Sequence, residues 1–275
     1  MNLSNAIYRI IDVETTGLNK PDPSLHKSTK QKDKIVEVAF QDWQRSSSED
    51  QTWKLLKTES FFVDPLQPIP ANASAIHHII DADVKNQLFL LEAWKEATAD
   101  IDYPVVYVAH NARFDHAFLV SELTAATSEA LIETNVYKWI CTKRLAAKAF
   151  PDAPFGYSNQ VLRYWLNLDV SKEARAHRAS GDVEVTSKLL HHIIDLWISK
   201  VSGNKHAEHL LSFEAILARC WEAVEQTNCN FGKHKGKPWS DVPTSYLEWI
   251  LKGYNKGDNW EEDVIHTVKK QLEGR

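Results

Sequence analysis

Apolar residues in the first part of the chain fall into short runs separated by polar segments. Ala6–Val13, Ile35–Phe40 and Ser60–Val63 are rich in branched and aromatic residues, and their spacing predicts three strands in an antiparallel meander. Val105–Ala109 is a continuous apolar run, typical of a strand that is covered on both faces, and Trp139–Thr142 predicts another short strand.

Helical patterns appear between and after these strands. They predict a short helix within Ile69–Ile80, an amphipathic helix over about Arg113–Glu122 and a long helix over about Ser180–Lys200. Val183, Leu189, Leu190, Ile193, Ile194 and Trp197 form the expected buried stripe of the long helix. Strands followed by alternating helices and strands indicate an α/β (α+β) domain built on a mixed sheet.

A change in composition near 201–205 divides the chain. We expect a main domain over 1–200 and a small, mainly helical module over 201–275 that begins with a connecting helix, about His206–Glu225. The module contains FGKHKGK (Phe231–Lys237). A segment of this size has little core of its own, so we expect it to pack on the main domain.

Composition restricts the partners and the compartment. The net charge is -5, so the whole surface is not cationic, and a polyanion must be held by local patches or by metal ions. The three cysteines are too few and too scattered for a disulfide framework, which favours a reducing compartment. The sequence has no apolar stretch near the roughly 20 residues that span a bilayer. With no N-terminal signal pattern, we expect a cytoplasmic protein without a membrane partner.

Four acidic residues lie where strands end or helices begin. Asp12 and Glu14 end the first strand, and their two-residue spacing puts both side chains on one face. Asp115 follows another strand and starts a helix, and Asp182 starts the long helix. Taken singly, each has an ordinary explanation, either an exposed strand end or an acid that complements a helix dipole.

His177 precedes Asp182 by five residues. Within one helix that separation is about 140° around the axis, so a shared site requires His177 to lie on the loop before the helix. A loop histidine can act as a base near neutral pH, although an isolated one is more often an ordinary surface residue.

Taken together, these residues favour a metal centre. Four clustered carboxylates repel one another unless cations offset the charge, and their hard oxygen ligands favour two Mg²⁺ ions, for which Mn²⁺ could substitute. Such a pair suits phosphodiester hydrolysis, in which one ion activates the attacking water and the other stabilises the leaving oxygen. His177 would accept the proton of the water.

The motifs that carry these residues are IDVETTGL (Ile11–Leu18), HNARFD (His110–Asp115) and HRASGD (His177–Asp182). They resemble the DEDDh 3′–5′ exonucleases, and AIHHI (Ala75–Ile79) with FGKHKGK resembles the exonuclease X subgroup. The resemblance implies an RNase-H-like fold, a mixed five-stranded sheet flanked by helices. It also implies that Asp12, Glu14, Asp115 and Asp182 bind metal, and that His177 as general base and Glu14 are catalytic.

The activity implied by the resemblance is two-metal hydrolysis of the terminal phosphodiester of DNA, single-stranded and also at duplex ends, which releases 5′-mononucleotides. The implied partner is a nucleic acid with a free 3′ end, with DNA favoured over RNA. Two alternatives remain open at this point. The catalytic motifs do not separate sugar types, so an RNA-directed exonuclease is one, and a nucleic-acid-binding adaptor is the other.

Residues next to the motifs are candidates for nucleic-acid contacts. They are Thr15, Gly17, Leu18, His77, Asn111 and Phe114. For Leu18, His77 and Phe114 the alternative is a structural place in the core.

Basic residues outside the motifs supply further candidates. Lys233, Lys235 and Lys237 alternate with aromatic residues, a composition that suits contact with a nucleic-acid backbone, whereas Trp239, Tyr246 and Trp249 are expected in the module's own core. The segment Asn19–Lys34 is a long lysine-rich loop, and Asp42–Lys57 also appears as an extended connection.

Overall fold

The computed structural model describes residues 6–18, 33–45, 52–100, 105–127, 131–201, 212–229, 231–255 and 262–275. The chain divides into two compact units, Met1–Cys220 and Trp221–Arg275, and each is described by itself. The lysine-rich part of the predicted 19–34 loop lies outside the described residues.

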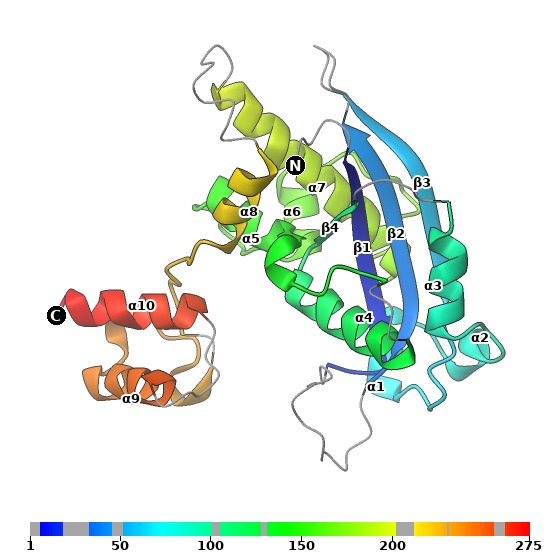
Figure 1. Ribbon diagram of the computed structural model, residues 1–275. Helices are drawn as coiled ribbons and strands as arrows, with labels where there is room; N and C mark the ends of the chain where they lie inside the picture. Colours follow the sequence, from blue (N-terminus) through cyan, green and yellow to red (C-terminus); the bar gives the residue numbers. More distant parts are fainter. Residues whose placement is uncertain are drawn as a thin grey trace. The chain divides into compact units, whose positions relative to one another are not determined.

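The first unit is built on a mixed five-stranded sheet in the order β3-β2-β1-β4-β5 (Figure 1). Its strands are β1 (Ile7–Thr15), β2 (Ile35–Arg45), β3 (Trp53–Phe62), β4 (Val105–Ala109) and β5 (Ile140–Cys141). β1, β2 and β3 pair antiparallel, whereas β4 is parallel to both β1 and β5. The predicted fold class is confirmed, with the meander first and the parallel strands after it.

β2 and β3 are longer than the sequence pattern predicts. β2 continues to Arg45 and β3 begins at Trp53, so most of the expected connection Asp42–Lys57 is strand. Aromatic packing extends the hairpin, because the His191 ring stacks on Trp53 with centroids 4.1 Å apart and meets the edge of Trp43 at 4.5 Å. The charged residues between these tryptophans hide the alternation in the sequence.

Helices cover both faces of the sheet. On one face, α7 (Ala179–Val201) packs against β1, β2 and β3, and its predicted buried stripe is buried. On the other face, α3 (Leu90–Thr98) brings Trp94 against Phe40, and α4 (Ala112–Ala126) packs on α3. The remaining helices of this unit are α1 (Ala71–His77), α2 (Asp81–Val84), the 3-10 turn η2 (Val136–Lys138), α5 (Thr142–Ala149), α6 (Asn159–Trp165) and α8 (Phe213–Trp221).

The second unit contains α9 (Thr244–Asn255), α10 (Glu262–Glu273) and two 3-10 turns, η4 (Gly232–His234) and η5 (Trp239–Asp241). Its core is formed by Cys229, Trp239, Val242, Leu247, Ile250, Val264, Ile265 and Val268.

The division between the units falls after Cys220, whereas the sequence pattern places it after 200. The reason is that α8 is tied to the first unit. The Cys141 N–H donates to Cys220 Sγ at 3.2 Å, and Arg144 Nε donates to the Cys220 carbonyl at 2.7 Å. Within the described residues of the expected helix His206–Glu225, only 213–221 is helical.

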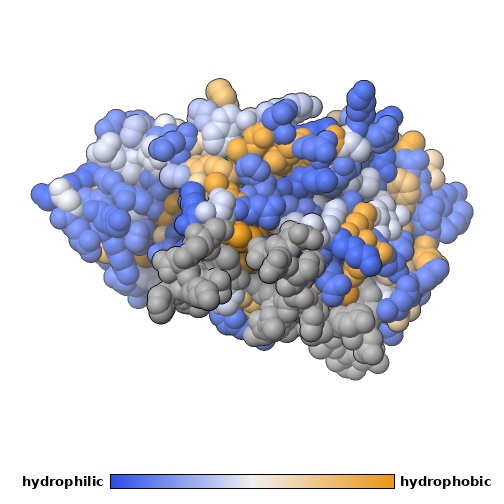
Figure 2. Space-filling model, turned by 90° about the horizontal axis from the view of Figure 1, so that it is seen from above, coloured by the Kyte–Doolittle hydropathy of each residue, from blue (hydrophilic) through white to orange (hydrophobic). Residues whose placement is uncertain are grey.

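Among the described helices, none is both long and apolar enough to cross a bilayer. On the face seen in Figure 2, hydrophilic residues predominate and apolar residues appear in small groups between them.

Candidate active site

Strand β1 supplies two carboxylates to the face of the sheet that α7 covers. Asp12 and Glu14 are two residues apart, so both point to this face, and α7 places Asp182 in its first turn above them. Oxygens of the three carboxylates lie within 4.8 Å of one another, close enough to share one cation. The predicted convergence of Asp12, Glu14 and Asp182 is therefore confirmed.

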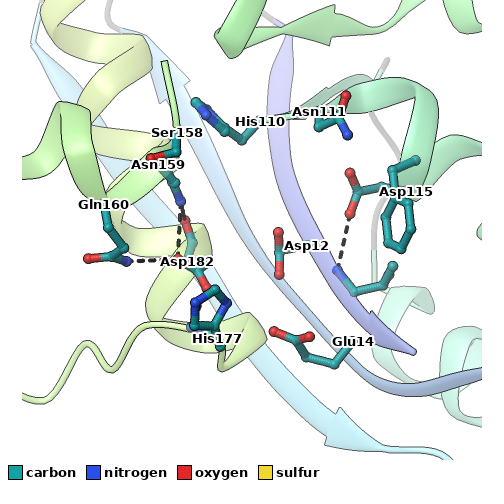
Figure 3. Close-up of a pocket in the computed structure, with 12 residues that line it drawn as sticks. Asp12, Glu14, His110, Asn111, Asp115, Ser158, Asn159, Gln160, His177 and Asp182 are labelled. Atoms are coloured by element: carbon teal, nitrogen blue, oxygen red, sulfur yellow. Dashed lines mark hydrogen bonds between the residues drawn. The ribbon is translucent and has the colours of Figure 1, made fainter. Parts of the chain in front are cut away.

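These carboxylates face a cavity of about 410 Å³. Its lining residues are Asp12, Val13, Glu14, His110, Asn111, Phe114, Asp115, Ser158, Asn159, Gln160, His177 and Asp182. In Figure 3, Asp12 occupies the middle, with Asp182 and His177 on one side and Asp115 on the other. Sequence motifs far apart in the chain thus meet in one cavity.

The parallel pairing of β1 with β4 brings Asp115 to the cavity, because α4 starts directly after β4 at the same edge of the sheet. Asp115 is buried, and its Oδ1 accepts a hydrogen bond from the Val13 N–H at 3.2 Å. It lines the cavity beside the cluster of three and is not a member of it.

Hydrogen-bond donors on two segments fix the orientation of Asp182. Its Oδ2 accepts from the His177 backbone N–H at 2.8 Å, and its Oδ1 accepts from Gln160 Nε2 at 2.9 Å. Asn159 Nδ2 donates to the Asp182 carbonyl at 3.0 Å and reaches Oδ1 at 3.3 Å (Figure 3). The sequence analysis did not identify Gln160 and Asn159 as site residues, since nothing in the local pattern links α6 to the start of α7.

Burial and mutual repulsion make the acidic cluster costly to ionise without cations. The pKa of Asp12 is raised well above its ordinary value, first by burial and then by Asp115, Asp182 and Glu14. Burial, followed by repulsion from Asp182, raises the pKa of Glu14 to about 8. Carboxylate oxygens that are crowded together in this way suit hard divalent cations, because the charge of the cation would stabilise the ionised carboxylates.

His177 lies on the loop before α7, as predicted, and its side chain is exposed at the cavity. Its backbone is in the left-handed region with φ 58°, where a non-glycine residue is held only by its surroundings. The loop also passes very close to the start of α7. A Cβ at Gly181 would lie only 2.2 Å from the Arg175 carbonyl oxygen. Glycine at 181 is therefore needed for this path of the chain.

An ion pair that sequence reasoning missed anchors the same loop. Arg178 binds both oxygens of Glu37 on β2, with Nη2 to Oε1 at 2.8 Å and Nε to Oε2 at 3.2 Å. The Ala179 N–H also donates to Glu37 Oε2 at 3.1 Å. Glu37 is buried and pairs with Glu14 across the sheet, so Arg178 neutralises a further acid beside the cluster.

His110 is a further cavity residue that the sequence analysis did not identify as part of the site. Its Nε2 lies 2.7 Å from the Tyr157 carbonyl, which accepts only, so this nitrogen carries the proton. Its Nδ1 then accepts from the Thr142 hydroxyl at 3.0 Å. Burial lowers the pKa of His110 to about 4, so the ring is neutral and positions the segment that leads into Ser158 and Asn159.

The predicted nucleic-acid contacts fall into different surroundings. Asn111 and Phe114 line the cavity. Thr15 and Gly17 form the turn after the acids, where Thr15 Oγ1 donates to the Gly17 carbonyl at 2.6 Å. Leu18 is 79% exposed, which excludes the core alternative and leaves it available for contact.

His77 occupies a structural position. It is 2% exposed, and its Nδ1 accepts from the Ile79 N–H at 3.0 Å. The imidazole also interacts with the backbone of Thr15, so it supports the end of β1. These contacts favour a structural role for His77, which is one of the two interpretations that the sequence left open. Lys233, Lys235 and Lys237 belong to the second unit and are exposed there.

Comparison with known proteins agrees with this geometry. A family model described as exonuclease matches residues 10–190. The chain is 30% identical to exodeoxyribonuclease 10 of Escherichia coli strain K12 over 97% of this chain and 99% of that protein. It is 27% identical to the DNA polymerase III subunit epsilon of Treponema pallidum over 67% of this chain and 77% of the relative.

A solved structure of exonuclease X in complex with 5′ overhanging duplex DNA matches the fold with a TM-score of 0.51 and 27% identity. The match covers 78% of this chain and 99% of that one. The resemblance of the motifs is thus confirmed over nearly the full length. On the family match and the near full-length relative together, the chain belongs to the exonuclease family.

Proposed function

We propose that this exonuclease uses two Mg²⁺ ions to remove 5′-mononucleotides from the 3′ end of DNA. The observation that carries the proposal is the cluster of Asp12, Glu14 and Asp182, whose carboxylate oxygens lie within 4.8 Å of one another in a cavity that Asp115 also lines. The raised pKa values of Asp12 and Glu14, caused first by burial, fit a site for divalent cations better than a purely structural role.

Asp12, Glu14 and Asp182 would hold one ion, and Asp12 with Asp115 the other. Carboxylate oxygens of this kind favour Mg²⁺, and Mn²⁺ could substitute for it. When bound, the ions supply charge neutralisation at the phosphate and activation of water.

The chain's own groups do the remaining work. His177 accepts a proton from the attacking water, because its ring is exposed beside Asp182 at the edge of the cavity. Gln160 and Asn159 keep Asp182 in position. Asn111 and Phe114, which line the cavity, and the exposed Leu18 would contact the terminal nucleotide, and Thr15 and Gly17 form the turn before Leu18.

DNA is the proposed substrate rather than RNA, because the near full-length relative is an exodeoxyribonuclease and the matched exonuclease X structure contains DNA. An RNA-directed activity would need contacts to the 2′-hydroxyl. We also propose that the protein acts in the cytoplasm.

Competition between substrates tests the proposal. Single-stranded DNA and RNA of equal sequence, carrying different 5′ labels, are mixed with the protein and Mg²⁺. We expect faster shortening of the DNA, and no shortening by the Asp12→Ala variant. Faster shortening of the RNA would overturn the choice of substrate, whereas degradation of both by Asp12→Ala would overturn the assignment of the site.

A further inference from the structure

Backbone hydrogen bonds hold a turn in the second unit that carries three lysines. The Cys229 N–H donates to the Lys237 carbonyl at 2.8 Å, and the Gly236 N–H donates back to the Cys229 carbonyl at 2.7 Å. Gly232 and Gly236 have φ of 60° and 89°, which glycine adopts without strain. The turn is thus held together by its own backbone hydrogen bonds and is not an open, solvated loop.

The turn packs on helix α9 through Tyr246. The buried His234 ring meets the edge of Tyr246 with centroids 4.7 Å apart. A Cβ at Gly232 would lie 2.4 Å from the Tyr246 hydroxyl, so glycine is needed for this close approach. With His234 turned inward, the lysines on either side of it, Lys233 and Lys235, are left exposed.

One helical turn after Tyr246, Trp249 extends an aromatic surface. The two rings stack with centroids 5.3 Å apart and planes at 24°, and Lys233 Nζ lies 5.2 Å from the Tyr246 ring centre. Trp249 is 55% exposed, so its expected place in the core is wrong, whereas Trp239 is fully buried as expected. Exposed tryptophan beside cations is typical of surfaces that stack on bases.

Local charge identifies the kind of partner. Residues 229–240 contain three lysines and no acidic residue, although the whole chain has a net charge of -5. This segment therefore complements a polyanion locally. Lysine for phosphates and a stacked aromatic pair for bases together favour a nucleic acid with unpaired bases, because bases inside a duplex are already stacked on their neighbours.

We propose that Lys233, Lys235, Lys237, Tyr246 and Trp249 form a binding surface for single-stranded nucleic acid, called here the lysine–tryptophan surface. The lysines contact phosphates, and Trp249, supported by Tyr246, stacks on a base. The inference rests on the proposed function only in that the substrate is a nucleic acid. It adds a second contact, outside the acidic cavity, that selects unpaired strands.

Binding of the full chain to a fluorescent oligothymidylate tests the proposal. Anisotropy is measured in EDTA, so the result does not depend on hydrolysis. Trp249→Ala should weaken binding by roughly 5- to 150-fold, which corresponds to the loss of one stacked base. Trp249→Phe, which keeps a ring, should retain most of the affinity.

Changing Lys233, Lys235 and Lys237 to Gln should lower the slope of log affinity against log salt by about 2, since each single-strand phosphate contact contributes about 0.7. The same unit offers matched controls. Tyr254 is 42% exposed with Lys269 Nζ 5.7 Å from its ring centre, and Tyr254→Ala should leave binding unchanged. Changing Lys269 and Lys270, which lie on α10, to Gln removes charge from the same unit and should leave the salt slope unchanged.

Wild-type affinity for the Trp249→Ala variant, equal losses in the control variants, or equal affinity for a blunt duplex would each overturn the proposal. Thermal unfolding of every variant shows whether it is folded. Hydrolysis by the wild type in Mg²⁺ is measured separately. Its absence would contradict the proposed function alone, while the binding results would still decide the lysine–tryptophan surface.

Discussion

Asp12 and Glu14 lie on a strand whose other residues are mostly apolar and buried, and this placement governs the chemistry of the site. Because burial and neighbouring acids raise the pKa of both groups, the cation-free protein carries a cluster that resists ionisation. A bound cation would remove that cost. The same residues that lower the stability of the cation-free protein are thus those that give it an affinity for metal.

Replacing Asp12 by Asn should separate these two effects. Hydrolysis should be lost, while the cation-free protein at pH 8 should become more stable, by the order of 1 kcal/mol, because one repelling carboxylate is gone. Chemical denaturation in EDTA measures the stability, and a nuclease assay in Mg²⁺ measures the activity. A variant that is both less stable and fully active would contradict the role given to Asp12.

The imidazole of His177 should matter for turnover and little for cation binding. His177→Ala should lose most hydrolysis, yet calorimetric titration with Mn²⁺ should match the wild type, because Asp182 is oriented by the backbone N–H of 177 and not by the ring. An unchanged rate would remove the histidine from the mechanism.

Spacing along the chain predicted the acids and His177, because strand period and helix starts place them without knowledge of the fold. The same reasoning did not identify Glu37 and Arg178. They are separated by 141 positions and meet only because α7 lies across β2. The usable signals were a lone acid within the apolar run of β2 and an arginine directly after His177.

At the scale of elements, α7 is the part that assembles the site, since its first turn carries Asp182 and the loop before it carries His177. Its start is fixed on β2 by the pair of Arg178 with Glu37. The side chain of Arg178 is 30% exposed, and that of Glu37 is 1% exposed. Removing the arginine would therefore leave a buried carboxylate without its main counter-ion.

Arg178→Ala should lower the free energy of unfolding by roughly 2–3 kcal/mol. This value is at or below the lower end of the range for breaking a buried ion pair, because the arginine is partly exposed. It should also reduce turnover more than it changes KM, since the His177 loop loses its anchor. Urea denaturation and steady-state kinetics measure both effects, and added guanidinium should restore part of the turnover.

The matched control is Lys138→Ala, which breaks the exposed pair with Glu133 and should cost less than about 1 kcal/mol. Equal effects of the two substitutions would show that Arg178 has no special role. If guanidinium restored the stability of Arg178→Ala without restoring its turnover, the role of Arg178 would be structural only.

His191 on α7 provides a pH-dependent test of the packing between α7 and the β2–β3 hairpin. Burial lowers its pKa to about 3, so the folded protein keeps it neutral while the unfolded chain binds a proton below pH 6.5. Stability should therefore fall as the pH drops from about 6.5 towards 3, by up to about 1.4 kcal/mol per pH unit from this residue.

His191→Phe keeps a ring between Trp43 and Trp53 and should remove that part of the acid sensitivity. Urea denaturation of both proteins at pH 7, 5.5 and 4 measures the difference. Parallel loss of stability in the two proteins would contradict the neutral, buried histidine. The length of the hairpin that holds this ring was underestimated from the sequence, because polar and charged residues interrupt the apolar pattern of both strands.

At the scale of the whole molecule, apolar periodicity sufficed for the fold class, the strand order of the meander and the long helix. The position of the division between the units was not predictable, because α8 is held by contacts of Cys220 with Cys141 and Arg144, which are distant in sequence. The exposure of Trp249 was also not predictable from the sequence, because a tryptophan at helical spacing lies more often in a core.

The most direct test of the account is the digestion of one single-stranded DNA, labelled at the 5′ end or at the 3′ end, with and without Mg²⁺. We predict that Mg²⁺ allows release of the 3′ label at once as a mononucleotide, while the 5′ label passes through a ladder of shortening products, and that EDTA stops both. Release of the 5′ label first, or equal digestion in EDTA, would contradict a cation-dependent 3′–5′ exonuclease.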